Sequence, residues 1–315
     1  MEKNAHWYDE QCKKLLSNKK IIVNILKREI SEYKHLSEDE ILKLISEPQF
    51  NRKNQGEYLE TRNVEDYSIQ GELIVYDVLL YAGLPDSDEA VGLIINFEAQ
   101  GSMPNYSVLK RGFYYLSRLI ARQKGHPFGF QKSEYSKLKK AVSIWICRTD
   151  KKRKGMLNVY AIQEESRGTK VRFPKSEYDV MQLIVISPDD RMPERKGTVE
   201  FLSLLFGQVS PVENVIERLE KEYGVMLEER EKKEVMEMCN WSMASRLDGI
   251  EEGRKKGKRE GKREGKREGR KEEAVKIARK MLMHGQSAES VCCFTELSEA
   301  EVLHLKETMN SVLLS

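Results

Sequence analysis

The chain has 315 residues, of which 39% are apolar and 33% charged, and its formal net charge is +3. This length predicts about two domains with a buried core, and no apolar run approaches the ~20 residues of a membrane-spanning helix. The five cysteines show no CxxC spacing and no HExxH motif occurs, which excludes the common zinc sites and a disulfide framework. Because the chain has no basic and then apolar leader, we expect a cytoplasmic protein without membrane contact.

The first predicted elements are helices. Residues 7–47 have helical character, and a capping box at residues 37–40 opens a short helix. Residues 73–82 are rich in β-branched, aromatic and other apolar side chains, which predicts a strand. A turn-rich segment at 83–89 separates this strand from a second one at 91–99, so the two are expected to pair as a hairpin.

The later elements are mixed at first and then purely helical. A helix is predicted at residues 105–123, and further strands at 141–149, 157–162 and 180–187. From Pro193 onward only helical patterns occur. This order indicates an α/β core up to about residue 210, followed by an all-helical C-terminal extension.

Two carboxylates lie in the predicted hairpin. Asp77 is the only charged residue in the apolar run 73–82, so we expect it in a strand that is buried on both faces. An ionised carboxylate there is unfavourable by several kcal/mol unless it is paired or binds a cation. The hairpin can bring Asp77 beside Glu98, and two carboxylates suit a hard cation such as Mg²⁺. Alternatively, Asp77 lies at a strand edge or pairs with an arginine.

The helix at 105–123 has two distinct faces. One face is apolar and is expected to pack on the core: Leu109, Phe113, Leu116 and Ile120. The opposite face carries arginines, which suit phosphate, and a tyrosine, which can stack on a base: Arg111, Tyr115, Arg118 and Arg122. This face is a candidate DNA-binding stripe, and the alternative is an ordinary solvated helix face.

A glycine recurs every four residues from Gly253 to Gly269, in a GKRE-type repeat. Residues 251–273 hold 11 Lys and Arg but 7 Glu, so the segment has a local charge of +4. A basic segment favours polyanions because phosphate binding releases counterions. The alternatives are a charged linker or a low-complexity expansion, either marginally helical or flexible.

The last residues predict a small helical module. A helix at 274–284 is stopped by Gly285, a second is predicted at 287–294, and a capping box at 298–301 opens a third to about residue 309. The pattern resembles a helix-turn-helix-like module, although Glu296 stands where a glycine is expected. We expect the module either to recognise DNA or to function in packing or self-association.

Four strings of the sequence, in this order, resemble one protein family. They are VYDVLLY at 75–81, LIINFEAQ at 93–100, LKRGFYY at 109–115 and VSIWIC at 142–147. ERLEKEYG at 217–224 and MEMCN at 236–240 extend the likeness, which covers roughly residues 15–247. The chain resembles the PD-(D/E)XK nuclease family transposases, related to the bacterial recombination-promoting nucleases. The resemblance implies a restriction-endonuclease-like core, in which helices flank a central mixed sheet, and DNA phosphodiester hydrolysis that depends on Mg²⁺ or Mn²⁺.

The resemblance also implies roles for residues of the hairpin. Asp77 and Glu98 are the acidic metal ligands, and the carbonyl of Ala99 is a third ligand. Gln100 stands where the wider superfamily has a lysine, and it would orient the attacking water without supplying a positive charge.

Two more elements contribute under the same resemblance. Arg111 or Lys110, on the helix after the hairpin, would supply the missing charge and steady the phosphate. Glu29, on the first helices, would complete the acidic site.

The expected function is therefore that of a Mg²⁺-dependent DNA endonuclease associated with mobile elements or recombination, with no small-molecule cofactor. Two alternatives stay open: a nuclease-fold protein that binds DNA but cuts it weakly or not at all, and an assembly protein that recruits partners through its basic tail. The oligomeric state, including a homo-oligomer, also stays open. The expected domains are a nuclease-like domain at 1–210, a helical extension at 211–247, the basic repeat at 248–273 and the helical module at 274–315.

Overall fold

The structure is a computed structural model that describes residues 10–46, 49–50, 65–67, 73–85, 87, 89–100, 106–127, 129–147, 155–168, 171–189, 197–206 and 213–313. The chain divides into two compact units, Met1–Ala244 and Ser245–Ser315. Within the described ranges, no helix is both long and apolar enough to cross a membrane.

The first unit is built around a mixed β-sheet. Its strands and those of a second, two-stranded sheet are β1 Gln49–Phe50, β2 Glu65–Tyr67, β3 Leu73–Val75, β4 Val78–Ala82, β5 Leu93–Gln100, β6 Lys140–Cys147, β7 Met156–Ala161 and β8 Met181–Ser187. The order in the main sheet is β1-β4-β5-β6-β8-β7. β5, β6 and β8 run parallel, β4 and β7 are antiparallel to their neighbours, and the short β1 extends the β4 edge. The predicted α/β core with a central mixed sheet is thus confirmed.

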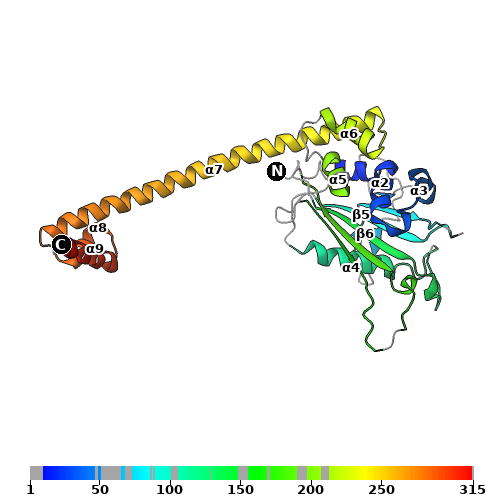
Figure 1. The fold of residues 1–315 in the computed structure, drawn as a ribbon, viewed down its shortest axis with the longest axis horizontal. Coiled ribbons are helices and arrows are strands. Elements are labelled where there is room, and N and C mark those ends of the chain that lie inside the picture. The colour runs from blue at the N-terminus through cyan, green and yellow to red at the C-terminus, as the bar shows by residue number, and fades with distance from the viewer. Residues whose placement is uncertain are drawn as a thin grey trace. The chain divides into compact units, whose positions relative to one another are not determined.

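Helices cover both faces of this sheet (Figure 1). On one face, α4 (Val108–Ala121) packs with Trp145 and Leu183. On the other face, the N-terminal helix (residues 10–16), α2 (Lys19–Glu29) and α5 (Thr198–Leu205) pack with Ile144 and its neighbours. Because alternate residues of β6 enter the two layers, this strand is buried on both faces.

Side-chain caps fix the starts of the first helices. The side chain of Asn18 accepts hydrogen bonds from the backbone N–H groups of Lys20 and Ile21, at the start of α2. The predicted capping box is confirmed: Ser37 and Glu40 bond reciprocally at the start of α3 (Glu38–Leu44). Three short 3-10 helices complete the described turns: η1 Ser31–Tyr33, η2 Tyr135–Lys137 and η3 Lys175–Glu177.

The predicted hairpin forms, but its first strand is interrupted. Val78 of β4 pairs with Phe97 of β5, whereas the chain bends at Asp77 and β3 pairs with β2 in the second sheet. The expectation of one continuous strand over 73–82 is therefore wrong, whereas the expected burial on both faces is confirmed for β4. The side chain of Asp77 is 16% exposed at the bend. A bend at a sheet margin places this lone charge where it reaches polar partners instead of apolar neighbours. The other four predicted strands correspond to β5, β6, β7 and β8.

The buried face of α4 matches the predicted one only in part. Its buried residues are Val108, Gly112, Tyr115, Leu116 and Leu119, whereas Phe113 is 43% exposed. A Cβ atom on Gly112 would lie 2.8 Å from Cδ1 of Leu183, so the missing side chain lets the helix approach the sheet closely. The helix is consequently turned so that Tyr115 faces the core. Of the predicted apolar face, Leu116 is buried and Leu109 and Ile120 pack against the core, whereas the expectation for Phe113 is wrong.

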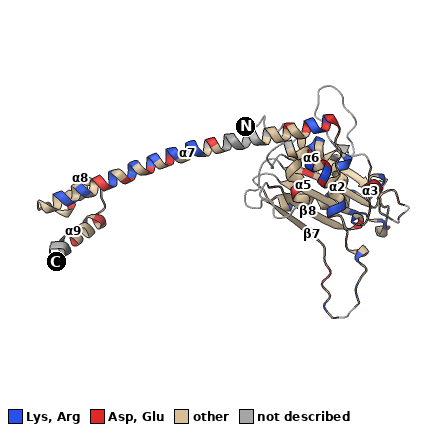
Figure 2. Ribbon diagram, turned by 45° about the horizontal axis from the view of Figure 1, so that its top comes forward, with Lys and Arg blue, Asp and Glu red and all other residues tan. Residues whose placement is uncertain are grey.

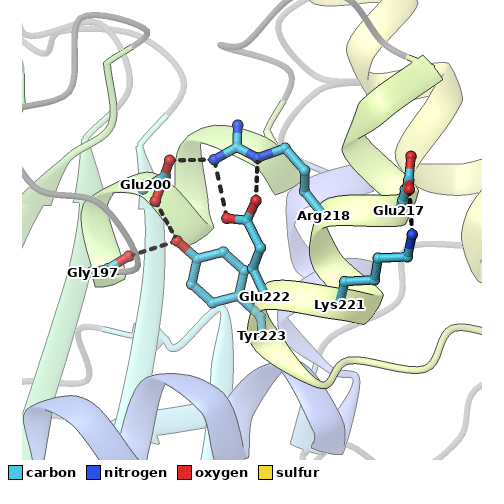
Figure 3. Close-up of polar contacts among 7 residues, drawn as sticks. All are labelled: Gly197, Glu200, Glu217, Arg218, Lys221, Glu222 and Tyr223. Carbon is cyan, nitrogen blue, oxygen red and sulfur yellow. Dashed lines mark hydrogen bonds and ion pairs between the residues drawn. The ribbon is translucent and has the colours of Figure 1, made fainter.

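The predicted helical extension, residues 211–247, contributes to the core of the first unit. α6 (Glu213–Tyr223) and the start of α7 (Glu229–Met283) bury apolar side chains in the same core cluster as the N-terminal helix and α2. Figure 3 shows one polar connection: Glu200 of α5 pairs with Arg218 and accepts a 2.8 Å hydrogen bond from the hydroxyl of Tyr223. The compact unit accordingly extends to Ala244 and does not end near residue 210.

In the second unit, the basic repeat is helical. Charged residues of both signs follow one another along α7 (Figure 2). Residues 253–273 are all exposed. The helix ends at Met283, and Gly285 follows with a φ of 79°. The glycine provides the positive φ that stops the helix, as the sequence predicts.

The small helical module also forms as predicted. α8 (Ala288–Thr295) is capped by Ser287, and the predicted capping box at the start of α9 (Glu299–Leu313) is confirmed by bonds between Ser298 and Glu301. Glu296 adopts the left-handed conformation, with φ 58° and ψ 13°. A glutamate therefore fills the position that usually takes a glycine. The core of the module is formed by Ala278, Val291, Leu297, Val302 and Leu305.

Candidate functional site

Asp77 and Glu98 face each other at one end of the hairpin. Because Val78 pairs with Phe97, the next two residues in register are Asp77 and Glu98. The N–H of Asp77 donates to Oε1 of Glu98 at 3.3 Å, and the N–H of Ala99 donates to Oδ2 of Asp77 at 2.9 Å. The hairpin thus brings the two carboxylates together near the carboxyl end of β5.

Glu98 is held in an unfavourable environment for a charged carboxylate. It is 4% exposed, and burial, followed by the negative charge of Asp77, raises its pKa well above the ordinary 4.5. The hydrogen bond from the N–H of Asp77 and the charges of Arg111 and Lys13 act in the opposite direction. The pair is therefore stabilised either by a proton on Glu98 or by additional positive charge.

A buried amide touches the same carboxylate. Nδ2 of Asn96 donates to Oε1 of Glu98 at 3.2 Å, and Asn96 is completely buried two residues before Glu98 on the same face of β5. Within the described residues, Oδ1 of Asn96 has no hydrogen-bond partner. The amide of Asn96 therefore holds Oε1 of Glu98 in position.

Two basic side chains approach the acidic pair from opposite layers. Nζ of Lys13, on the N-terminal helix, lies 2.7 Å from Oδ1 of Asp77. Arg111, on α4, lies close enough to Glu98 for its charge to lower the pKa of that carboxyl. Two negative and two positive side chains thus meet at this end of the sheet.

Arg111 is fixed by aromatic side chains. Its Nε donates to the hydroxyl of Tyr115 at 3.1 Å, and its guanidinium lies 5.3 Å from the ring centroid of Tyr106 and 5.4 Å from that of Trp145. Burial alone would lower the pKa of Arg111, but the bond to Tyr115 and the charge of Glu98 outweigh it and raise the pKa. Arg111 is a permanently charged group with a defined position.

Ala99 and Gln100 lie beside the acidic pair. In a strand, the N–H and C=O of one residue point to the same side. Because the N–H of Ala99 donates to Asp77, the carbonyl of Ala99 lies on the side of β5 that faces Asp77. Gln100 is the last residue of β5, is partly exposed, and shares a face with Glu98.

Glu29 does not belong to this site. It accepts a hydrogen bond from Thr198 and lines a cavity of about 340 Å³ together with Lys140 and Gln182. Lys140 begins β6 and pairs with Leu93, the first residue of β5, so the cavity lies at the opposite end of the parallel strands from Glu98. The expectation that Glu29 completes the acidic site is wrong, because α2 ends over the amino ends of these strands.

The predicted DNA-binding stripe is only partly accessible. Tyr115 is 5% exposed beneath Arg111, so the expectation that it stacks on a base is wrong. Arg118 is paired with Asp66 at 2.8 Å, and Arg122 lies over the ring of Tyr76 at 5.9 Å. Lys110 is exposed, and its backbone N–H donates to the hydroxyl of Ser107. Of these five residues, Arg111 and Tyr115 lie near the carboxylates: burial, followed by the charge of Glu98, raises the pKa of Tyr115.

Sequence reasoning missed Lys13 and Asn96. Asn96 could have been found, because an amide two residues before Glu98 in an otherwise apolar strand must lie on the same face. Lys13 gives no comparable signal, since its contact with Asp77 depends on how the N-terminal helix packs across the sheet.

The residues at this site fit a hard divalent cation. Within the described residues, no group of three or more His, Cys, Asp and Glu side chains could hold a metal ion. The site offers two carboxylates and the carbonyl of Ala99. Mg²⁺ is usually held in this way by one or two carboxylates, with waters and substrate phosphate oxygens completing the octahedron.

Comparisons of the chain with known protein families, with curated proteins and with solved structures found no match.

Proposed function

We propose that the protein is a metal-dependent DNA endonuclease of the PD-(D/E)XK type, acting in recombination or on mobile elements. The observation that carries the proposal is the buried Glu98 beside Asp77. Two adjacent carboxylates, one of which is almost fully buried, are unfavourable for folding but suitable for a divalent cation. The sequence resemblance of the strings around both residues supports the same conclusion.

Asp77, Glu98 and the carbonyl of Ala99 would hold the cation. The cation would neutralise phosphate charge and favour ionisation of the attacking water. In the reaction, the attacking water would lose a proton to solvent while its oxygen forms a new P–O bond. One ester P–O bond would break, and the leaving oxygen would take a proton from solvent.

Two residues next to the acidic pair suit a DNA strand. Arg111 presents a fixed guanidinium, which matches phosphate geometry. Tyr106 is 50% exposed and accepts a hydrogen bond from Arg111, so its ring can stack on a base beside that phosphate. Gln100 can orient the water through its amide but adds no positive charge.

A plasmid-nicking assay with Mg²⁺, Mn²⁺ or EDTA tests the proposal. Asp77→Asn and Glu98→Gln remove one negative charge each with little change in shape, and we expect each to reduce metal-dependent nicking by at least about 100-fold. Glu29→Gln is the matched control and should keep the wild-type rate, because Glu29 lies at the other end of the sheet. Undiminished nicking by Asp77→Asn would refute the assignment.

A second candidate is a DNA-binding protein that does not cut. The uncharged Gln100 and the exposed basic residues of α7 favour it. In the same assay, this candidate predicts no nicking in any metal, together with salt-sensitive DNA binding that survives both substitutions.

A further inference from the structure

Lys13 is held against the acidic pair by the packing of its helix. Its neighbours Cys12, Leu15 and Leu16 are at most 2% exposed in the core of the first unit. This anchoring leaves the side chain of Lys13 30% exposed and places Nζ 2.7 Å from Oδ1 of Asp77. The contact therefore follows from a buried helix face and not from a loose surface side chain.

The charges at the site balance without a metal ion. Asp77 and Glu98 carry two negative charges when ionised, and Lys13 and Arg111 carry two positive ones. A divalent cation adds two positive charges, which the phosphodiester and an ionised water would offset. Substrate and cation together would thus restore neutrality, whereas the cation alone would leave the site positive.

The two basic residues differ in freedom. Arg111 is bonded to Tyr115 and Tyr106 and lies against Trp145, so its position is fixed. Lys13 has a flexible stem, is partly exposed, and carries a compact charge that can move by rotation about its side-chain bonds. Of the two, only Lys13 directly contacts a carboxylate proposed as a metal ligand.

We propose that Lys13 is an exchangeable counter-ion of the acidic pair: its ammonium occupies Oδ1 of Asp77 in the metal-free protein and moves to the substrate phosphate when a divalent cation takes that oxygen. This inference rests on the proposed function. It assigns to Lys13 the positive charge that Gln100 does not supply. Lys13 then has two opposite effects: it competes with the cation for Asp77, and it assists turnover.

The test compares Lys13→Met, Lys13→Arg and Lys14→Met in the full chain. Lys14 is the matched control because it is the next residue of the same helix, is also half-buried, and shows no side-chain contact with the acidic pair. Two quantities are measured: the affinity for Mn²⁺ alone by calorimetry, and the rate of metal-dependent plasmid nicking.

For Lys13→Met we expect Mn²⁺ to bind about tenfold more tightly, because a competing charge is removed, while nicking slows by about tenfold or more. Lys13→Arg should keep the wild-type Mn²⁺ affinity within about threefold and restore part of the rate, and Lys14→Met should match the wild type in both measurements. This opposite movement of affinity and rate is not expected from a merely structural lysine.

Other outcomes overturn the inference. If the wild type binds Mn²⁺ and nicks DNA but Lys13→Met leaves both values unchanged, or weakens Mn²⁺ binding, Lys13 is not an exchangeable counter-ion, and the endonuclease function stands. If the wild type neither binds Mn²⁺ nor nicks DNA, the proposed function fails, and the inference about Lys13 fails with it.

Discussion

Two buried glutamates of the first unit should respond in opposite ways to the same substitution. Glu98 and Glu200 are each 4% exposed. Glu98 lies beside the carboxylate of Asp77, whereas Glu200 pairs with Arg218 and accepts a hydrogen bond from Tyr223. Replacement by glutamine removes one negative charge at each position with almost no change in shape, so it isolates the electrostatic contribution.

For Glu98→Gln in the absence of metal, we expect an increase of about 1–3 kcal/mol in the free energy of unfolding at neutral pH. Burial and the charge of Asp77 raise the pKa of Glu98 on folding, so its ionised form is less favourable in the folded state than in the unfolded state. The amide oxygen of glutamine can still accept the bonds from Asp77 and Asn96. The substitution therefore removes the buried charge and the repulsion but keeps the hydrogen bonds.

The pH dependence of stability tests independently whether Glu98→Gln is more stable than the wild type. Burial and Asp77 raise the pKa of Glu98 in the folded state, so the group is neutral in both states well below its ordinary 4.5. The variant and the wild type should then have nearly equal stability in acid. As pH rises through the elevated folded pKa, the wild type loses stability relative to Glu98→Gln, and the difference reaches its full size above that value.

For Glu200→Gln we expect a loss of about 1.5–3 kcal/mol, because charged hydrogen bonds to Arg218 and Tyr223 are weakened. Thermal unfolding followed by circular dichroism measures both variants, since 1 kcal/mol corresponds to about 2–4 °C for a unit of this size. The reasoning is refuted if Glu98→Gln is destabilised at neutral pH as strongly as Glu200→Gln.

Two further predictions concern the second unit, and amide hydrogen exchange of the full chain checks both. Glu296→Gly should slow exchange at the end of α8 by about fivefold, since relief of the left-handed conformation is worth about 1 kcal/mol; faster exchange would show that Glu296 makes a stabilising contact instead. Gly261→Ala should slow exchange in the middle of α7 by a similar factor, because a Cβ there meets nothing within 4 Å and alanine favours the helix by about 1 kcal/mol; unchanged exchange would contradict this.

The hairpin was predictable because strand periodicity is local. Alternation along residues 91–99 places Glu98 on a definite face, and the turn between the two apolar runs sets the pairing direction. The interruption at Asp77 was not predicted, although its signal was present. A single charge in an apolar run is more easily accommodated at a bend than inside a sheet that is buried on both faces.

The buried face of α4 was predicted only in part, because two apolar stripes lie side by side on this helix. Leu109, Phe113, Leu116 and Ile120 form one stripe. Val108, Gly112, Tyr115 and Leu119 form another. The close approach of Gly112 to Leu183 buries this second stripe together with Leu116 and leaves Phe113 exposed. A glycine counts as non-apolar in a periodicity analysis, yet here it marks the point of closest approach. Turning the helix this way buries Tyr115 and leaves its hydroxyl to hold Arg111.

Topology decides which N-terminal helix contributes a side chain to the acidic site, and local sequence patterns do not encode topology. Glu29 and Lys13 lie on consecutive helical segments, and the sequence gives no reason to prefer one of them. In the structure, Glu29 at the end of α2 reaches Thr198 near the amino ends of the parallel strands, while the preceding helix reaches Asp77 near the carboxyl end of β5. The site therefore receives a lysine where the resemblance implied a third carboxylate. A third negative charge beside the buried Glu98 would raise its pKa further, whereas the ammonium of Lys13 lowers it. The acidic pair can thus persist in the folded protein without a bound cation, as the proposed exchange of Lys13 for a cation requires.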